Sequence, residues 1–158
     1  ELGLAIAFAY PAALKEWFNE KYPNTSLHFN HQSIAYLKGL KGQLRERAQS
    51  SIYVLINDQE VLMAGFNFSR LAIYNQFQFS DSMSLVNGIL STAKQFSEEG
   101  QSIPVLLHGS KSLVDKNLPT LKKYFKNIEL GQRPSDIMIH PIFNELEGME
   151  YFDVLSNL

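Results

Sequence analysis

The middle of the chain consists of three apolar runs separated by short polar turns. The runs cover Ile52–Ile56, Val61–Phe68 and Leu71–Phe79. Gaps this short permit only antiparallel hairpins, because a parallel return needs a crossover of a dozen or more residues. The pattern therefore predicts a three-stranded meander, with Gly65 marking a bulge in its second strand.

Strand and helix patterns alternate on both sides of this meander. Before it, we predict a buried strand at Leu4–Ala9, a helix in AALKEWFNEKYPN, a short strand in TSLHF and a helix at Gln32–Ala48. After it, we predict a helix for which Ser80-Asp81-Ser82 offers N-caps, a strand in IPVLLHG, a helix in SKSLVDKNLPTLKKYF and a strand in KNIEL. The weakly patterned tail from Pro134 ends in FDVLSNL, which could form a helical turn. The order β-α-β-α, then β-β-β-α-β-α-β, predicts an α/β protein with a mixed sheet.

Periodicity also predicts which faces of the helices are buried. In the first long helix, Ile34, Leu37, Leu40 and Leu44 share one face, and Lys38, Lys41 and Arg45 share another. In the helix after the meander, we expect the buried face to contain Met83, Val86, Leu90, Ala93 and Phe96, and Gly100 to end the helix. Pro119 is tolerable in the next helix if Asn117 caps its main part.

Composition limits the classes of function. The chain has 158 residues and 45% hydrophobic residues, which suits one domain or two small lobes. Its net charge of −2 gives no electrostatic case for binding nucleic acid or an anionic membrane. Its apolar run LGLAIAFAYPAAL is shorter than the ~20 residues of a membrane span. The chain has no cysteine, which excludes thiolate catalysis and fits a reducing compartment such as the cytoplasm.

The segment SSIYVLINDQEVLMAGFNFSRLAIYNQFQFSDSMSLVNGIL resembles the second lobe of the actin-like ATPase superfamily, which has a ribonuclease-H-like fold. IPVLLHGSKSLVDKNLPTLKKYF resembles the adenosine-side strand, turn and helix of that superfamily, and AIAFAYPAALKEWFNEKYPNTSLHFNHQSIAYL resembles the end of its first lobe. More narrowly, GFNFSRLAIYNQFQFSD, LLHG and EYFDVL are similar to an uncharacterised bacterial family, the domain of unknown function numbered 3822. The resemblance implies a first-lobe remainder at 1–49, a second lobe at 50–133 and a tail at 134–158. It also implies that the first three strands of the first lobe would precede Glu1.

The resemblance places a nucleotide site, by position only, at Asn57, Asp58, Gln59, Gly109 and Ser110. In ATP-using relatives, the turn between the first two strands carries an acid followed by glycines, which let backbone N–H groups approach phosphate. Here that turn has no glycine and carries two carboxylates, and the adenosine-side turn has a single glycine. These departures argue against ATP hydrolysis by this chain alone, and we expect no cofactor.

Other candidate sites have simpler interpretations. Asp58 and Glu60 could bind a divalent metal, but a hairpin turn explains them better. His28, His31 and His140 fit turn or surface positions, and His108 fits a strand end better than a catalytic base. GSKS at Gly109 fails the P-loop spacing, so Ser110 or Ser112 is expected to cap a helix. The basic cluster from Lys38 to Arg47 is typical of a solvated helix face, and spacing assigns most of the aromatic residues to the core.

These observations leave three alternative hypotheses for the function of the chain. The favoured one is a non-catalytic actin-like module that acts through protein contacts, with a protein partner or a second copy, because the fold signature lacks the phosphate-binding glycines. The second is a divergent nucleotide-binding ATPase or kinase-like protein. The third is a metal-dependent nuclease that uses Asp58 and Glu60. An unpaired first-lobe remainder would leave apolar surface exposed and recruit a partner.

Overall fold

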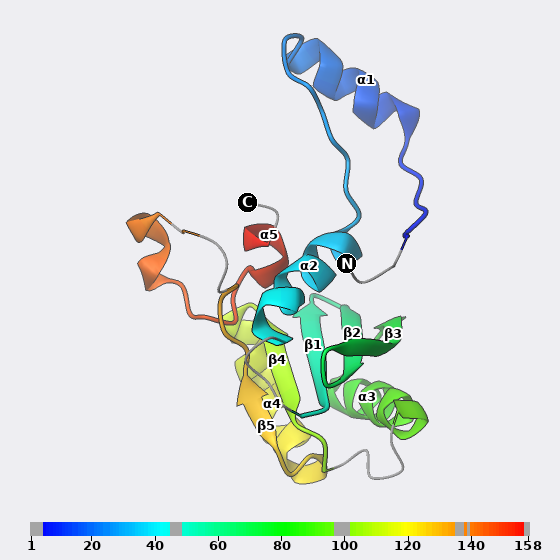
Figure 1. The fold of residues 1–158 in the computed structure, drawn as a ribbon, viewed down its shortest axis with the longest axis vertical. Helices are drawn as coiled ribbons and strands as arrows, with labels where there is room; N and C mark the ends of the chain where they lie inside the picture. Colours follow the sequence, from blue (N-terminus) through cyan, green and yellow to red (C-terminus); the bar gives the residue numbers. More distant parts are fainter. Residues whose placement is uncertain (1–4, 45–48, 97–101, 135–137, 139, 157–158) are drawn as a thin grey trace.

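A computed structural model describes residues 5–44, 49–96, 102–134, 138 and 140–156. Its centre is one five-stranded mixed sheet (Figure 1). The strands are β1 (Ser51–Asn57), β2 (Glu60–Asn67), β3 (Arg70–Gln78), β4 (Val105–Gly109) and β5 (Ile128–Leu130). They lie in the order β3-β2-β1-β4-β5, so the predicted meander and the two later strands form a single sheet. The prediction of an α/β protein with a mixed sheet is confirmed.

The meander has the predicted antiparallel geometry. Asn57 pairs with Glu60 and Asn67 pairs with Arg70, so each turn contains two residues. The ladder between β2 and β3 shifts at Gly65, which confirms the predicted bulge. By contrast, β4 runs parallel to β1 and β5 runs parallel to β4. These parallel strands follow crossovers that contain helices α3 (Ser82–Phe96) and α4 (Lys111–Tyr124).

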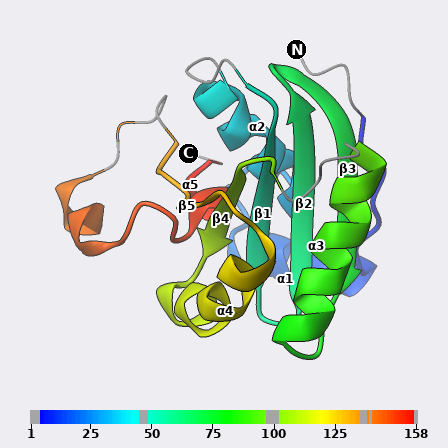
Figure 2. The same ribbon diagram turned by 90° about the horizontal axis from the view of Figure 1, so that it is seen from below.

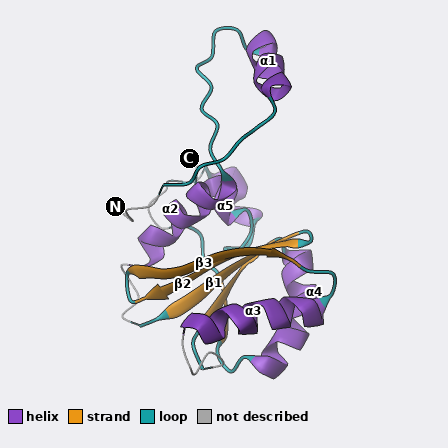
Figure 3. Cartoon of the chain, turned by 90° about the vertical axis from the view of Figure 1, so that its right-hand side faces the viewer, coloured by secondary structure: helices purple, strands orange, loops and turns teal. Residues whose placement is uncertain are grey.

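Helices cover both faces of the sheet (Figure 3). Alternate residues of β1 point to opposite faces, so Ile52, Val54 and Ile56 join one apolar core while Tyr53 and Leu55 join the other. Helices α3 and α4 cover the first face and lie in front of the sheet in Figure 2. Helix α2 (Gln32–Leu44) and the short α5 (Phe152–Leu155) cover the second face. Burial on both faces explains why β1 is an almost continuous apolar run.

Two details of the helices on the first face differ from the predictions. The buried stripe of α3 is centred about 100° from Met83 around the helix axis, and Met83 is exposed. The buried residues of this stripe are Leu85, Val86, Ile89, Thr92 and Ala93, and Leu90 is partly buried against the core. The side chain of Phe96 and the position of Gly100 lie outside the described residues.

Asn117 does not cap α4, because the helix runs without interruption from Lys111 through Pro119. The Asn117 side chain is buried in mid-helix, where it donates to the carbonyl of Leu113 at 2.8 Å and accepts from Ser82 Oγ at 2.7 Å. Pro119 is tolerated because it lies on the exposed side, where water can reach the carbonyl of Asp115 that loses its helical donor.

Helix α2 follows its prediction as far as it is described. Leu37, Leu40 and Leu44 are buried and Ile34 is partly buried, whereas Lys38 and Lys41 are exposed. Arg45, Glu46 and Arg47 lie outside the described residues. The backbone of α2 approaches α5 so closely at Gly39 that a Cβ atom there would collide with Ser156 and Phe152. The predicted terminal helical turn is thus present as α5, after a 3-10 helix at Pro141–Glu145.

The largest disagreement concerns residues 5–31, which we call the arm. Helix α1 (Ala12–Lys21) is present as predicted, but residues 5–9 and 25–29 form no strand. We call the rest of the described chain the body. Figure 1 shows the arm projecting from the body with α1 at its far end. A strand needs a neighbour to satisfy its backbone groups, and neither segment pairs with a strand of the described sheet. The two predicted strands are therefore wrong for the described residues.

The arm and the meander also correct the assignment of aromatic residues to the core. Phe66 is buried, and Tyr74, Phe77 and Phe79 are partly buried against the two cores. Trp17 on α1 is 50% exposed, and Phe68 in the β2–β3 turn is 62% exposed. No described helix combines the length and the apolar character needed to cross a membrane.

Candidate functional site

The predicted nucleotide residues lie along one edge of the sheet. In the parallel pair of β1 and β4, Ile56 is opposite Gly109, so Asn57 and Ser110 follow paired positions on neighbouring strands. Ligands of α/β proteins commonly bind at the carboxyl ends of parallel strands. The N-termini of α3 and α4 follow the ends of β3 and β4. We call this region the carboxyl edge.

The Asn57–Glu60 segment is a tight hairpin turn. Asn57 and Glu60 close the ladder of β1 and β2, and Asp58 has a positive φ of 49°, a conformation that Asp and Asn tolerate better than most residues. The side chains of Asn57, Asp58 and Gln59 are exposed. Glu60 Oε1 accepts a hydrogen bond from Gln76 Nε2 at 2.6 Å across the sheet. The hairpin interpretation is confirmed, and local backbone geometry accounts for these residue types.

Gly109 is required by the fold at the end of β4. Its φ is +139°, and a Cβ atom would lie 2.5 Å from the carbonyl oxygen of Ile56. Its N–H donates to the carbonyl of Met149 at 3.0 Å. An N–H group that is already bonded to a carbonyl is not available to a phosphate. The glycine therefore serves the close approach of β4 to β1 and to the 147–150 segment.

Ser110 occupies the position before the first turn of α4, but its hydroxyl does not cap the helix. Ser110 Oγ instead lies 3.3 Å from Ser112 Oγ. The prediction that one of these hydroxyls caps α4 is therefore wrong. The helix receives a different acceptor, from a distant part of the chain.

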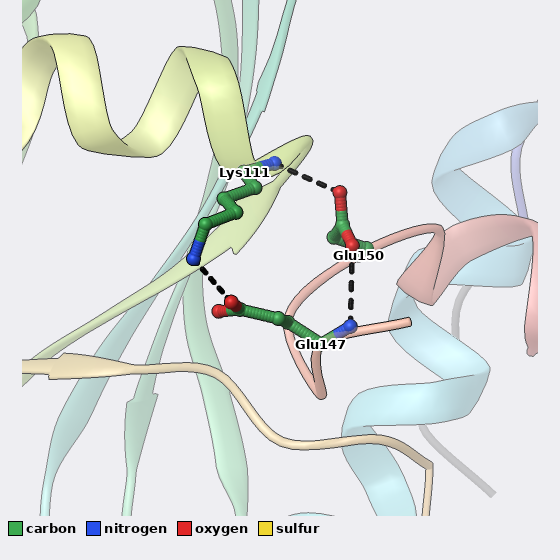
Figure 4. Close-up of polar contacts among 3 residues, drawn as sticks. All are labelled: Lys111, Glu147 and Glu150. Atoms are coloured by element: carbon green, nitrogen blue, oxygen red, sulfur yellow. Dashed lines mark hydrogen bonds and ion pairs between the residues drawn. The ribbon is translucent and has the colours of Figure 1, made fainter. Parts of the chain in front are cut away.

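That acceptor is the carboxylate of Glu150, which belongs to a segment that we call the strap (residues 147–150; Figure 4). Glu150 Oε1 accepts from the backbone N–H of Lys111 at 3.0 Å, and Glu150 Oε2 accepts from the N–H of Glu147 at 3.1 Å. Lys111 Nζ forms an ion pair with Glu147. Met149 is buried in the core beneath α4. The strap thus covers the N-terminus of α4 with a carboxylate.

The electrostatics of the strap follow from these contacts. The N–H groups of Lys111 and Glu147 lower the pKa of Glu150, because they bond its charged form. Glu147 raises the pKa of Lys111, first through the hydrogen bond and then through its charge. Lys111 and Glu147 are both exposed, so their ion pair contributes little to stability by itself. The helix dipole at α4 is nevertheless already matched by a negative charge.

The N-terminus of α3 is closed in the same way. Asp81 Oδ1 accepts from the backbone N–H groups of Ser84 at 2.8 Å and Met83 at 2.9 Å, which confirms the predicted cap. These bonds, that of Ser84 first, lower the pKa of Asp81. Both helices at the carboxyl edge therefore carry a carboxylate of this chain where an anionic ligand would bind.

A shallow depression of about 360 Å³ lies beside the hairpin turn. Its lining residues are Gln59, Gln78, Phe79, Ser80 and Ser84. Gly109 and Ser110 are not among them, so the depression does not unite the two halves of the predicted nucleotide site.

The histidines divide into surface and core residues. His28 and His140 are exposed, and His31 is half-buried near the base of the arm, as expected for turn and surface positions. His108 is fully buried in β4 between Tyr36 and Phe152, whose ring centroids lie 5.8 and 4.2 Å from its own. Burial lowers its pKa to about 3, with a backbone contact from Gln132 acting in the opposite direction. His108 is a neutral core residue, and its aromatic neighbours lie so far away in the sequence that no local pattern indicates them.

Within the residues that the structure describes, no three acidic or histidine side chains come close enough to hold a metal ion. Asp58 and Glu60 thus lack a third described ligand, and a metal-dependent nuclease would need one.

Comparison with solved structures defines the class of fold. The chain is similar to a Bacteroides thetaiotaomicron VPI-5482 protein described as having an actin-like ATPase fold and unknown function, with a TM-score of 0.67 and 18% identity. The match covers 90% of this chain and 49% of that protein, so the chain spans about half of its length. The fold is therefore that of the actin-like ATPases, as the sequence resemblance implied. A family of proteins of unknown function, DUF3822, matches residues 1–128, and the chain belongs to this family. No curated protein matches the chain.

Proposed function

We propose that this chain is a non-catalytic actin-like module that acts through protein contacts. The observation that carries the proposal is the closed carboxyl edge. Glu150 and Asp81 supply carboxylates to the N-termini of α4 and α3, the two helix ends that would otherwise attract phosphate. A nucleotide phosphate would have to displace them and would meet their negative charge.

The hairpin turn supports the same proposal. Asp58 is exposed at the tip, and the turn contains no glycine that would let a phosphate approach its backbone N–H groups. Gly109, the one glycine of the adenosine-side turn, already donates its N–H to Met149. The residues at this edge are explained by their bonds within the chain, without reference to a ligand.

The arm supports the role in protein contacts. Helix α1 has no buried residue, Leu14 and Trp17 on it are exposed large apolar side chains, and so is Tyr22 directly after it. Exposed aromatic clusters of this kind are typical of protein interfaces. The cysteine-free composition fits a reducing compartment and supports a cytoplasmic setting for this role.

Isothermal titration with ATP and Mg²⁺ tests the non-catalytic role. We expect no heat of binding at micromolar nucleotide, with the purified chain at a concentration of tens of micromolar. The Glu150→Gln variant should also give no heat of binding, because the Gly109 N–H still donates to the Met149 carbonyl and Asp81 still caps α3. Micromolar binding to the unmodified chain would overturn the proposal.

A second candidate is a divergent nucleotide-binding protein, and the actin-like ATPase fold together with the alignment of Asn57–Gln59 and Gly109–Ser110 along one edge favours it. It predicts adenine near Gly109 and Ser110. Amide chemical shifts of these residues, recorded with a panel of nucleoside triphosphates and diphosphates, distinguish the two candidates. If no nucleotide shifts them or raises the melting temperature, the second candidate is dropped.

A further inference from the structure

The 3-10 helix Pro141–Glu145, which we call the knob, presents apolar side chains to water. Ile142 is 72% exposed, Phe143 is exposed, and Glu145 beside them is an exposed carboxylate. Figures 1 and 2 show this helix, in orange, projecting from the sheet and its covering helices. Exposed apolar side chains with a charge at their rim are typical of protein interfaces.

Hydrogen bonds to the main chain hold the knob in place. Arg133 Nη2 donates to the carbonyl of Phe143 at 2.6 Å and to the carbonyl of Leu146, directly after the knob. Gln43 Nε2, from α2, donates to the carbonyl of Gln132 at 2.6 Å and so fixes the chain just before Arg133. A segment that is ordered before it binds loses less conformational entropy on binding. The exposed side chains of the knob are therefore preorganised for a contact.

Charge is distributed unevenly between the C-terminal segment and α4. Residues 134–158 contain five of the 16 acidic residues and neither lysine nor arginine. Residues 111–126 contain five of the 14 basic residues and a single acidic residue, Asp115. Two of the acids bond to Lys111 as part of the strap, and Glu145 is the exposed charge of the knob. The knob is thus acidic, and α4 is basic.

Most of the basic residues of α4 gather at its C-terminal end. Lys122 and Lys123 follow Pro119 by three and four residues, so the three share one face of the helix, and all are exposed. Tyr124 and Lys126 are exposed next to them. We call these five residues the patch. The helix dipole favours lysines at this end but does not account for the exposed Tyr124. The patch combines apolar surface with positive charge, which complements the knob.

We infer that the knob of one copy of this protein docks on the patch of a second copy. Ile142 and Phe143 pack against Pro119 and Tyr124, and Glu145 lies beside the lysines. This inference rests on the proposed role in protein contacts and names the partner as a second copy. Because the knob and the patch are different surfaces, the contact is head to tail, and each docked pair leaves one knob and one patch open to further copies.

Sedimentation velocity of the full-length protein tests whether copies associate. We expect species larger than a dimer to appear as the protein concentration rises. The association should weaken at least about threefold between about 0.1 M and about 0.5 M salt, because ions screen the attraction between Glu145 and the lysines. A protein that stays monomeric, or that stops at a dimer, would overturn the inference, since a symmetric dimer joins identical surfaces.

Charge reversal locates the contact. Glu145→Lys, and Lys122→Glu combined with Lys123→Glu, should each weaken the association at least about tenfold. Glu16→Lys is the matched control, because it reverses an exposed carboxylate on α1 and should leave the association within about twofold. Equal effects of Glu145→Lys and Glu16→Lys would show a dependence on overall charge and refute docking of the knob.

A mixture of these variants shows whether different surfaces meet. Glu145→Lys keeps an intact patch, and the double lysine variant keeps an intact knob. Each alone should stay monomeric at concentrations where the unmodified protein associates, and an equal mixture should associate, because the intact knob of one meets the intact patch of the other. If both variants have the circular dichroism of the unmodified protein and their mixture stays monomeric, the inference fails.

Photocrosslinking identifies the occupant of the knob in cells. A benzophenone amino acid replaces the exposed Ile142, and we expect crosslinks to residues 119–126 of a second copy. Crosslinks only to a different protein would refute the second copy as partner.

The outcomes also separate this inference from the proposed function. A protein that binds no nucleotide but stays monomeric loses only the docking inference. A protein that binds ATP and still associates through the knob and the patch loses only the non-catalytic role.

Discussion

His108 shows how burial sets the chemistry of one residue. The imidazole lies among Tyr36, Tyr53 and Phe152, and Tyr36 Oη is 3.5 Å from its Nδ1. An imidazolium there would lose its hydration without gaining an acidic partner, so the folded protein keeps the ring neutral. The residue has the type expected of a catalytic base, but its surroundings remove that role.

The lowered pKa of His108 predicts a loss of stability in mild acid. The unfolded chain binds a proton below about pH 6.5, while the folded chain does so only near pH 3. The stabilising contribution is therefore complete above pH 6.5 and is lost as the pH falls toward 3. Between pH 7 and pH 5 it amounts to about 2 kcal/mol. Urea unfolding at these two pH values measures it.

Two variants isolate the contribution of His108 to this pH dependence. In His108→Leu, the difference in unfolding free energy between pH 7 and pH 5 should shrink by about 2 kcal/mol. In His28→Gln, at an exposed histidine, the difference should match the unmodified chain. An unchanged difference in His108→Leu would show that the ring titrates normally in the folded state.

Gly109 gives a second prediction at the residue scale. Gly109→Ala should lower the unfolding free energy by at least about 2 kcal/mol, because its φ is +139° and the new methyl would meet the carbonyl of Ile56 at 2.5 Å. Gly148→Ala is the matched control, since its nearest heavy atoms lie at 3.4 Å, and it should cost less than about 1 kcal/mol. Urea denaturation compares the two. Equal costs would mean that Gly109 is not conformationally required.

The parts of the candidate site that could be predicted from the sequence are those formed by residues close together in the chain. Asn57 and Asp58 predicted the hairpin turn, and Asp81 predicted the cap of α3, because each bonds or turns within a few residues. The same local reasoning predicts Ser110 or Ser112 as the cap of α4, and neither hydroxyl caps it. Its true acceptor, Glu150, lies 39 residues away from Lys111, and no local pattern in the tail connects the two.

At the scale of elements, the strap links the C-terminal segment to the sheet through a few bonds. Glu150→Gln removes the charge that faces the N-terminus of α4 and weakens the acceptor of the Lys111 N–H. The amides of Lys111 and Gly109 should then exchange about two- to fivefold faster, as expected for losing one exposed charge–dipole interaction. Hydrogen exchange at pH 7, where the lowered pKa keeps Glu150 ionised in the unmodified chain, measures the change.

Glu145→Gln is the control for the strap, because Glu145 is an exposed carboxylate of the 3-10 helix that precedes it. It removes the same charge from the same region and should leave both amides unchanged. If the two substitutions accelerate exchange equally, the exchange rates depend on the overall charge of this region and not on the hydrogen bond between Glu150 and the Lys111 N–H.

The elements also show why some strands were predicted correctly and others were not. β1, β2 and β3 are joined by two-residue turns, so each strand brings its own partner, and the alternating pattern is sufficient. Residues 5–9 and 25–29 have comparable β-forming sequences but no partner in the described chain. A strand forms only beside a neighbouring strand that satisfies its backbone hydrogen bonds. The sequence of one segment shows its β-propensity but not whether such a neighbour is present.

At the scale of the whole molecule, the body and the arm are stabilised by different kinds of contact. The body has two apolar cores on either side of one sheet. The contacts of the arm are mainly between its own aromatic rings, and Ile6 packs against the second core. The chain has a single tryptophan, Trp17, which lies on α1 at the far end of the arm. Its fluorescence therefore reports the arm, while the far-ultraviolet circular dichroism mainly reports the body.

This separation predicts that the two signals do not follow one transition. During urea unfolding, the circular dichroism should change cooperatively, whereas the Trp17 emission should start near that of a solvated indole and shift little at the same midpoint. A chain with Trp17→Phe and Phe66→Trp moves the reporter to a buried site of β2, and its fluorescence should coincide with the circular dichroism. If Trp17 emission in the unmodified chain coincides with the cooperative transition, the arm is coupled to the sheet within this chain. The exposed apolar side chains of α1 would then be explained by contacts within this chain, and the arm would no longer support the proposed role in protein contacts.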